Sequence, residues 1–114
     1  MKLPNAQTAL VEREKITDYL LNSLHLYGAG KARYFLRFGF RLEAWEVFAQ
    51  ALREHGQQPE VTAKAETPFG PRYEVEGAIR TPDGRNPRIR TVWQVGKGRL
   101  APRLISAYPV EQIP

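Results

Sequence analysis

Two stretches near the carboxyl end of the chain decide its fold: Arg88-Ile89-Arg90-Thr91-Val92-Trp93-Gln94-Val95 and Pro102-Arg103-Leu104-Ile105-Ser106-Ala107-Tyr108-Pro109. Both contain β-branched and aromatic residues, and a glycine-containing segment, 96–99, lies between them, so they predict two adjacent antiparallel strands. Both also carry arginines and hydroxyl groups, which is more polar chemistry than a purely structural sheet needs. We therefore expect the function to lie on this part of the sheet.

Two further strands are expected upstream of this pair. Residues 72–79 alternate polar with apolar side chains, as a half-exposed antiparallel strand does, and residues 60–65 form a weaker strand before a turn at 68–71. A cluster of turn residues, 81–87, joins strand 72–79 to the strand at 88–95, which we call the basic strand. Together these segments predict a four-stranded antiparallel sheet.

Three helices are expected before the first strand. Apolar residues recur at helical spacing in segments 11–21, 30–38 and 42–54, and Gly39 and Gly56 follow the second and third as terminators. This order predicts an α+β fold with three N-terminal helices packed on the four-stranded antiparallel sheet. We expect a single domain, 1–114, divided into an extended arm at 1–10, a helical half at 11–56 and an antiparallel sheet at 59–109.

The composition is that of a globular domain. Of the 114 residues 42% are hydrophobic and 25% are charged, and the absence of cysteine excludes disulfides and thiolate metal sites. No apolar run approaches the roughly 18 residues that a membrane helix needs, and no apolar signal core follows the first residues. We therefore expect a cytoplasmic protein with no membrane partner.

Positive charge is concentrated in the basic strand and its neighbours. Seven basic residues and one acidic residue lie from Arg80 to Arg103, a net charge of +6, whereas the whole chain carries +5. Six of the seven are arginines, whose planar guanidinium groups suit bidentate contact with phosphates or carboxylates. This field favours a polyanionic partner, nucleic acid or an acidic protein, although a solvated arginine-rich hairpin that binds nothing has the same composition.

The loop before the second helix holds two candidate functional side chains. His25 lies outside any regular apolar pattern, where an imidazole can act as a general acid or base. The Gly-Ala-Gly-Lys segment from Gly28 to Lys31 matches a Walker A loop only in part, because Ala32 follows where that motif has Ser or Thr, and no predicted strand precedes it. A helix start with these features can still hold one phosphate through its amides and its lysine, and a solvated lysine is the alternative.

Strand alternation suggests a cluster of donors on the sheet. It places Arg90 on the outward face of the basic strand, opposite the face that suits the core. Ser106 and Tyr108 share a face of the last strand with Leu104. If they flank Arg90 across the ladder, the three side chains form a group suited to phosphate oxygens.

Other polar residues have structural interpretations. His55, beside Gly56 in the last turn of the third helix, is interpreted as a cation that complements the helix C-terminus. Glu74 and Glu76 fit the solvated face of an alternating strand, and no metal constellation or nucleophile elbow is found. An enzyme with this sequence is therefore expected to work without metal or cofactor.

The sequence resembles a family of small bacterial domains of uncharacterised function, which also occur at the ends of polymorphic toxins and in phage head proteins. The resemblance covers nearly the whole chain. It rests on Lys2-Leu3-Pro4-Asn5-Ala6, on His25-x-x-Gly28-x-x-Lys31-Ala32-Arg33-Tyr34-Phe35 followed by Gly39-Phe40 and Trp45, on Arg90-Thr91-Val92-Trp93 and on the whole segment 102–109.

Helices followed by a four-stranded antiparallel sheet are also similar to the superfamily of barnase, EndoU, colicin E-type and RelE ribonucleases. This resemblance implies metal-independent cleavage of RNA, by attack of a ribose 2′-hydroxyl on the adjacent phosphate. EndoU-type sites use a histidine, a lysine, a hydroxyl residue and a tyrosine, and the positions that match in kind and order are His25, Lys31, Ser106 and Tyr108. EndoU-like enzymes carry two catalytic histidines, whereas this chain offers one in that region.

The resulting hypothesis is a metal-independent endoribonuclease toxin of a toxin–antitoxin or related system. His25 would move the proton of the 2′-hydroxyl or of the leaving 5′-oxygen, while Lys31 and Arg90 neutralise charge on the phosphorus. The expected catalytic residues are His25, Lys31, Arg90, Ser106 and Tyr108, and the expected phosphate or RNA contacts are Gly28, Gly30, Arg33, Arg88, Thr91 and Arg103.

The expected partners of such a toxin are RNA and a small acidic antitoxin or immunity protein. One alternative is a non-catalytic basic module that docks on an acidic protein or nucleic acid. Another is a structural phage or accessory protein.

Overall fold

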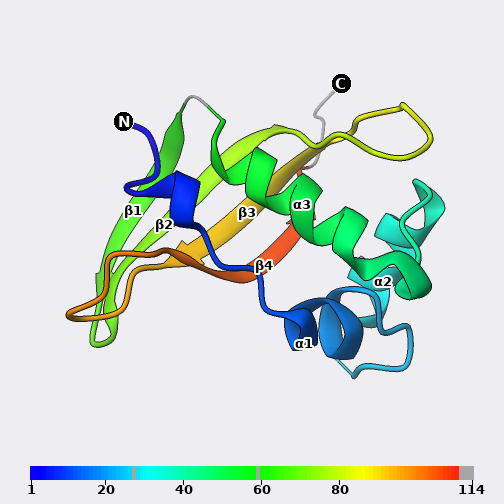
Figure 1. Ribbon diagram of the computed structural model, residues 1–114, viewed down its shortest axis with the longest axis horizontal. Helices are drawn as coiled ribbons and strands as arrows, with labels where there is room; N and C mark the ends of the chain where they lie inside the picture. Colours follow the sequence, from blue (N-terminus) through cyan, green and yellow to red (C-terminus); the bar gives the residue numbers. More distant parts are fainter. Residues whose placement is uncertain (27, 59, 111–114) are drawn as a thin grey trace.

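One four-stranded antiparallel sheet organises the fold (Figure 1). It is seen in a computed structural model that describes residues 1–26, 28–58 and 60–110. The strands pair in chain order, and their bounds are Val61–Thr67 for β1, Gly70–Ala78 for β2, Arg88–Gln94 for β3 and Arg103–Pro109 for β4. The predicted sheet is therefore confirmed, while Pro59, where its expected region begins, lies outside the described residues.

The α-helices of the described chain are α1 (Arg13–Lys15), α2 (Ala29–Arg37) and α3 (Trp45–Gly56). α3 lies across one face of the sheet, whereas α1 and α2 lie beside β4 (Figure 1). Phe48 and Leu52 of α3 share one buried cluster with Val75 and Trp93 of the sheet. The α+β prediction holds, but the expected packing of all three helices on the sheet is replaced by one helix on its face and two at its edge.

The first and third predicted helices are composite. α1 continues as a π-helical turn, Ile16–Leu20 (η2), in which the N–H of Leu21 donates to the carbonyl of Ile16 at 2.8 Å. This turn buries Ile16 and Leu20 and leaves Tyr19 between them only partly covered. α3 is preceded by a 3₁₀ turn, Leu42–Ala44 (η3), so the third helical region starts as expected and ends two residues later.

The N-terminal segment is more than an extended arm. It contains a 3₁₀ turn, Ala6–Thr8 (η1), and Leu3 and Ala9 are buried in the core. Leu10 then bridges to β4, because its N–H donates to the Pro102 carbonyl at 2.8 Å and its carbonyl accepts from Leu104 N–H at 2.9 Å. Apolar burial and these two bonds fix a segment in which periodicity alone predicts no structure.

A β-bulge in β4 decides which side chains face the open side of the sheet. Val92 pairs with Ser106 and Trp93 pairs with Leu104, so Ile105 is an extra residue in the ladder. Such a bulge shifts the alternation by one, and Leu104 is therefore buried in the core while Ser106 faces away from it. The predicted grouping of Leu104 with Ser106 on one face is wrong for this reason.

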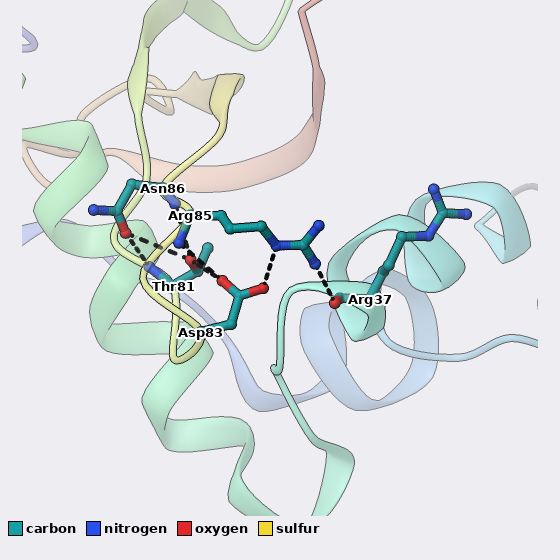
Figure 2. A network of polar contacts seen from close by, with 5 residues as sticks. All are labelled: Arg37, Thr81, Asp83, Arg85 and Asn86. Atoms are coloured by element: carbon teal, nitrogen blue, oxygen red, sulfur yellow. Dashed lines mark hydrogen bonds and ion pairs between the residues drawn. The ribbon is translucent and has the colours of Figure 1, made fainter.

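The loop between β2 and β3 is held by its own polar side chains (Figure 2). Thr81 Oγ1 donates to Asp83 at 2.8 Å, and the N–H of Thr81 donates to the side-chain oxygen of Asn86 at 2.9 Å. The Arg85 guanidinium pairs with Asp83 at 2.6 Å and donates to the Arg37 carbonyl, at the end of α2, at 2.8 Å (Figure 2). The expected turn thus also fastens α2 to the sheet.

A buried hydrogen-bond chain corrects two interpretations. Nε2 of His55 lies 2.9 Å from the Gly77 carbonyl and 3.1 Å from the Ile89 carbonyl, so this nitrogen carries the proton. Nδ1 then accepts from the Thr91 hydroxyl at 2.9 Å, and that hydroxyl accepts from Trp93 Nε1 at 2.8 Å. His55 is therefore a neutral bridge between α3 and the sheet, not a cation that complements the helix C-terminus, and the fully buried Thr91 cannot contact RNA.

Candidate functional site

Four of the five expected catalytic residues line one open cavity of about 740 Å³. It lies on the sheet face opposite α3, against β4 and the loop that leads into α2. His25 and Lys31 enter it from the loop and from α2, while Ser106 and Tyr108 enter from β4. The bulge in β4 makes this meeting possible, because without it Ser106 would point into the core.

Lys31 is the centre of the site. Its ammonium group donates to the phenol of Tyr19 and, at 3.0 Å, to the hydroxyl of Ser106. The same ammonium lies 5.8 Å from the ring centroid of Tyr108. An ammonium has three N–H donors, and these two hydroxyls use two of them within the described part of the chain, which leaves one for a bound anion.

Tyr19 is the site residue that the sequence did not reveal. Its phenol lies 3.3 Å from Ser106 Oγ, and its ring meets the His25 ring edge-on with centroids 5.0 Å apart. Partial burial raises the pKa of Tyr19, but its hydrogen bonds with Lys31 and Ser106 and the charges of Lys31 and Lys15 outweigh this effect, so the pKa is lowered overall. Its acidified phenol can therefore take part in proton transfer more readily than an ordinary tyrosine.

Gly28 is needed for this arrangement. A Cβ at this position would lie 2.7 Å from both Cδ1 and the carbonyl oxygen of Tyr19. Only a residue without a side chain lets the loop approach the π-helical turn so closely. Helical spacing puts Tyr19 near the same face of the predicted helix as Val11, Ile16 and Leu20, so no signal in the sequence separates Tyr19 from the core.

His25 is oriented by the backbone. The N–H of Gly28 donates to Nδ1 of His25 at 3.0 Å, so Nδ1 bears the lone pair and Nε2 the proton of the neutral ring. The amide of Gly28 is thereby used inside the protein, so the expected contact between this amide and a phosphate is not formed in this arrangement.

Arg90 is the fifth expected catalytic residue, and it does not line the cavity. Its Nε donates to Glu76 Oε1 at 2.8 Å, and Glu74 lies 3.9 Å away. Nη1 lies 3.4 Å from the phenol of Tyr108, its register partner on β4. Hydrogen bonds to Tyr108 and Glu76 raise the pKa of Arg90, so this guanidinium stays charged and is fitted to hold Tyr108 in place.

The expected phosphate contacts are scattered. Gly30 is exposed near the start of α2, and Arg33 is exposed on the same helix. Arg88 lies 3.9 Å from Glu76, and Arg103 lies 3.6 Å from Glu12 at the rim of a neighbouring cavity. None of these four lines the cavity that holds Lys31.

Within the described residues, no group of three or more histidine and acidic side chains is arranged to hold a metal ion. In the same part of the chain, no helix is long and apolar enough to span a membrane.

The fold and site define a small α+β domain with a lysine-centred cluster of hydroxyl, phenol and imidazole groups. Residues 2–111 match the family described as "Domain of unknown function (DUF6883)", and the chain belongs to that family. No curated protein matches the chain.

A solved structure with this fold is the "Contact-dependent growth inhibition toxin - immunity protein complex from Klebsiella pneumoniae 342". Its matching chain is 20% identical, with a TM-score of 0.73, and the alignment covers 94% of this chain and 97% of that chain. At this identity the similarity establishes a common fold.

Proposed function

We propose that the protein is a toxin domain that cleaves RNA without a metal ion. The observation that carries the proposal is the Lys31 ammonium, bonded to Tyr19 and Ser106 beside His25 in an open cavity. In this reaction the 2′-oxygen bonds to phosphorus and the bond from phosphorus to the 5′-oxygen breaks. The products are a 2′,3′-cyclic phosphate and a 5′-hydroxyl.

The two proton transfers are divided between His25 and Tyr19. His25 takes the proton of the 2′-hydroxyl on Nδ1, in exchange for its bond from Gly28, and the acidified phenol of Tyr19 gives a proton to the leaving 5′-oxygen. Tyr19 thus supplies the second proton-transfer group that a single histidine cannot provide. Lys31 stabilises the resulting phenolate and balances the negative charge that develops on the phosphate oxygens.

The remaining side chains position the phosphate. Ser106 and Tyr108 offer hydroxyl groups to its oxygens, and Arg90 keeps Tyr108 in place. Glu76 balances the charge of Arg90, so Lys31 and not Arg90 has the main electrostatic role.

The charge of the chain supports a toxin and not an inhibitor. The solved structure with the same fold is a complex of a toxin with an immunity protein. A protein that blocks a phosphate-binding site by charge complementarity is expected to be acidic, whereas this chain has a net charge of +5. We therefore propose a small acidic immunity protein or antitoxin as partner, covering the cavity of Lys31.

A non-catalytic binding module is the second candidate. It is favoured by one observation, namely that Gly28 already occupies the lone pair of His25. This candidate predicts salt-dependent binding of nucleic acid without breakdown of RNA.

Purified protein should cleave RNA in the presence of EDTA and leave 2′,3′-cyclic phosphate ends. Loss of one charge-stabilising donor typically costs on the order of 10² to 10³ in rate, so Lys31→Met should reduce cleavage by about that factor. His25→Ala and Tyr19→Phe should also reduce cleavage strongly. Arg41→Ala, which removes an exposed cation on the segment before α3, is the matched control and should leave the rate unchanged.

Binding without cleavage by the wild-type protein would select the binding module. Full activity in both Lys31→Met and His25→Ala would remove the site from the reaction. Expression from a tightly repressed promoter tests the toxin directly, because growth arrest should require His25 and Lys31.

A further inference from the structure

A second cavity adjoins the candidate site. Its volume is about 310 Å³, at the lower end of the roughly 300–1,000 Å³ that small-molecule sites occupy. Arg72 and Ile105 line both cavities, so the two are neighbours that share a wall. The tips of the two hairpins, β1–β2 and β3–β4, lie side by side (Figure 1). The second cavity is lined by Phe69 from the first tip, by Gly96 and Arg99 from the second, and by Arg103 and Ile105 of β4.

The lining of the second cavity is suited to an anion. It contains three arginines, Arg72, Arg99 and Arg103, and no acidic residue. Arg72 is held in place, because its Nε donates to Gln94 Oε1 at 3.3 Å. The Gln94 side chain is itself fixed, since its amide nitrogen donates to the carbonyls of Gly70 at 2.8 Å and Pro71 at 2.9 Å. Nε of Arg103 lies 3.6 Å from Oε1 of Glu12, which does not line this cavity.

An exposed aromatic ring borders the same cavity. Phe69 is 72% exposed at the tip of the β1–β2 hairpin and lines the cavity beside the arginines. Its N–H donates to Thr67 Oγ1 at 3.1 Å, and its carbonyl accepts from Lys97 N–H at 3.2 Å.

Gly70 allows this tip to pack closely against the β3–β4 hairpin. Its φ is +113°, and a Cβ there would lie 2.2 Å from the Val95 carbonyl oxygen. Phe69 is thus an exposed apolar ring on an anchored backbone, beside three guanidinium groups of which Arg72 is held by Gln94. An aromatic ring next to guanidinium groups is the combination that binds an unpaired base together with its phosphate.

We infer that the second cavity holds the nucleotide next to the one that is cleaved, with its base on Phe69 and its phosphate among Arg72, Arg99 and Arg103. This inference rests on the proposed function, and it names the substrate as single-stranded RNA. A dinucleoside monophosphate has one phosphate, which occupies the site of Lys31, so a good substrate needs a second phosphate and therefore at least one nucleotide more. A base-paired strand cannot present its base face to Phe69, so duplex RNA is a poor substrate.

The test compares kcat/KM on dinucleoside monophosphates with kcat/KM on single-stranded hexanucleotides. The hexanucleotides should be better by about 5- to 150-fold, the range that one stacked base typically contributes. Phe69→Leu should remove most of this preference, whereas Phe69→Tyr should retain it. Arg99→Gln should reduce the preference, and the remote Arg41→Gln should retain it.

Equal kcat/KM on the two substrate lengths in the wild-type protein would overturn the inference. The inference would also be overturned if Phe69→Leu and Arg99→Gln both kept the wild-type preference for hexanucleotides. If the wild-type protein cleaves no RNA, the proposed reaction fails. The second cavity is then tested by fluorescence anisotropy, which measures the Kd of DNA dimers and of DNA hexamers. The ratio of these two Kd values replaces the ratio of kcat/KM in the comparison of the variants. A length preference for DNA that depends on Phe69 and Arg99 would keep the second cavity while the catalytic proposal falls.

Discussion

Tyr19 acquires its chemistry from neighbours that are distant in sequence. Lys31 belongs to α2 and Ser106 to β4, yet both lie within hydrogen-bonding distance of the same phenol. Local sequence shows only a tyrosine beside buried leucines, which is why helical spacing assigns it to the core. The lowered pKa depends on tertiary contacts and could not be predicted from the pattern.

The ionisation of Tyr19 can be measured without any substrate. In an ultraviolet difference titration, the signal that is lost in Tyr19→Phe should report a phenol that ionises below the ordinary value of 10.0. Lys31→Met should move this signal to higher pH, because it removes a hydrogen-bond donor and a positive charge while partial burial remains. Lys2→Met, which removes an exposed lysine, is the control. A Tyr19 signal that stays in place in Lys31→Met would contradict the coupling.

His55 should make stability depend on pH. Burial lowers the pKa of His55 below its ordinary value of 6.5, although bonds to the carbonyls of Gly77 and Ile89 oppose this. Between the two pKa values the unfolded chain binds more protons than the folded chain, so the free energy of unfolding rises with pH in that window. Stability is therefore fully present above about 6.5 and declines as the pH falls toward the folded pKa.

Urea denaturation at several pH values tests this expectation. His55→Gln should flatten the slope below pH 6.5, the unperturbed value for histidine. At neutral pH, His55→Gln should also lower the free energy of unfolding by about 1–3 kcal/mol, because a buried hydrogen-bond partner is lost. His25→Gln is the matched control, since His25 is only partly buried. A slope that His25 and not His55 controls would refute the assignment.

At the scale of elements, sequence patterns predicted regular structure well and irregular structure poorly. The bounds of β3 and β4 lie within one residue of the predicted strands, because β-branched and aromatic residues dominate both. The bulge at Ile105 was not predicted, since one extra residue in a ladder leaves no mark in the strand's own composition. Because of this one residue, Leu104 points into the core while Ser106 points to the opposite side of the sheet, where it lines the candidate site.

The candidate site could be predicted only where its residues stand out in the local sequence. His25 and Lys31 stand out because a loop with glycines interrupts the apolar pattern, and Ser106 and Tyr108 stand out as polar residues on a strand. The sequence pattern assigns Arg90 to phosphate because it does not show that Glu76, on the neighbouring strand, pairs with this arginine. Which residues face each other across two strands is not visible in the local sequence. Charge pairing across strands thus limits what a run of arginines can indicate.

Arg85 should control how firmly α2 is held. Its guanidinium lies 4.3 Å from the centroid of the Phe38 ring and also bonds to Asp83 and to the end of α2 (Figure 2). Because Arg85 is mostly exposed, we expect Arg85→Ala to cost about 1 kcal/mol. Amide hydrogen exchange should accelerate at Phe38 and Gly39, whose N–H groups close the last turn of α2. Arg85→Lys should recover only part of the loss, because one ammonium cannot span both oxygens.

Protection of Phe38 and Gly39 that is the same in Arg85→Ala and wild type would show that the loop does not fasten α2. Arg80→Ala removes an exposed cation at the start of the same loop and serves as the control.

At the scale of the whole molecule, the basic segment divides into two parts with different surroundings. In the first part, Asp83 pairs with Arg85, and Glu76 pairs with Arg88 and Arg90. In the second part, Arg103 lies 3.6 Å from Glu12, but Arg99 and Arg103 border a cavity whose lining has no acidic residue. The net charge of the segment is therefore expressed as an attractive field mainly at the hairpin-tip end, next to the candidate site.

The salt dependence of binding distinguishes these two parts. For a single strand, the slope of log K against log salt is about −0.7 for each phosphate contacted by a cation. In the proposed arrangement Lys31 contacts one phosphate of a DNA hexamer, and Arg72, Arg99 and Arg103 together contact the next, so the slope should be about −1.4. Arg99→Gln should reduce the magnitude of that slope, by at most about 0.7, whereas Arg80→Gln, with the same change in net charge, should leave it in place. Equal effects of the two substitutions would show that the strand responds to total charge, and the division of the basic segment would then carry no meaning for binding.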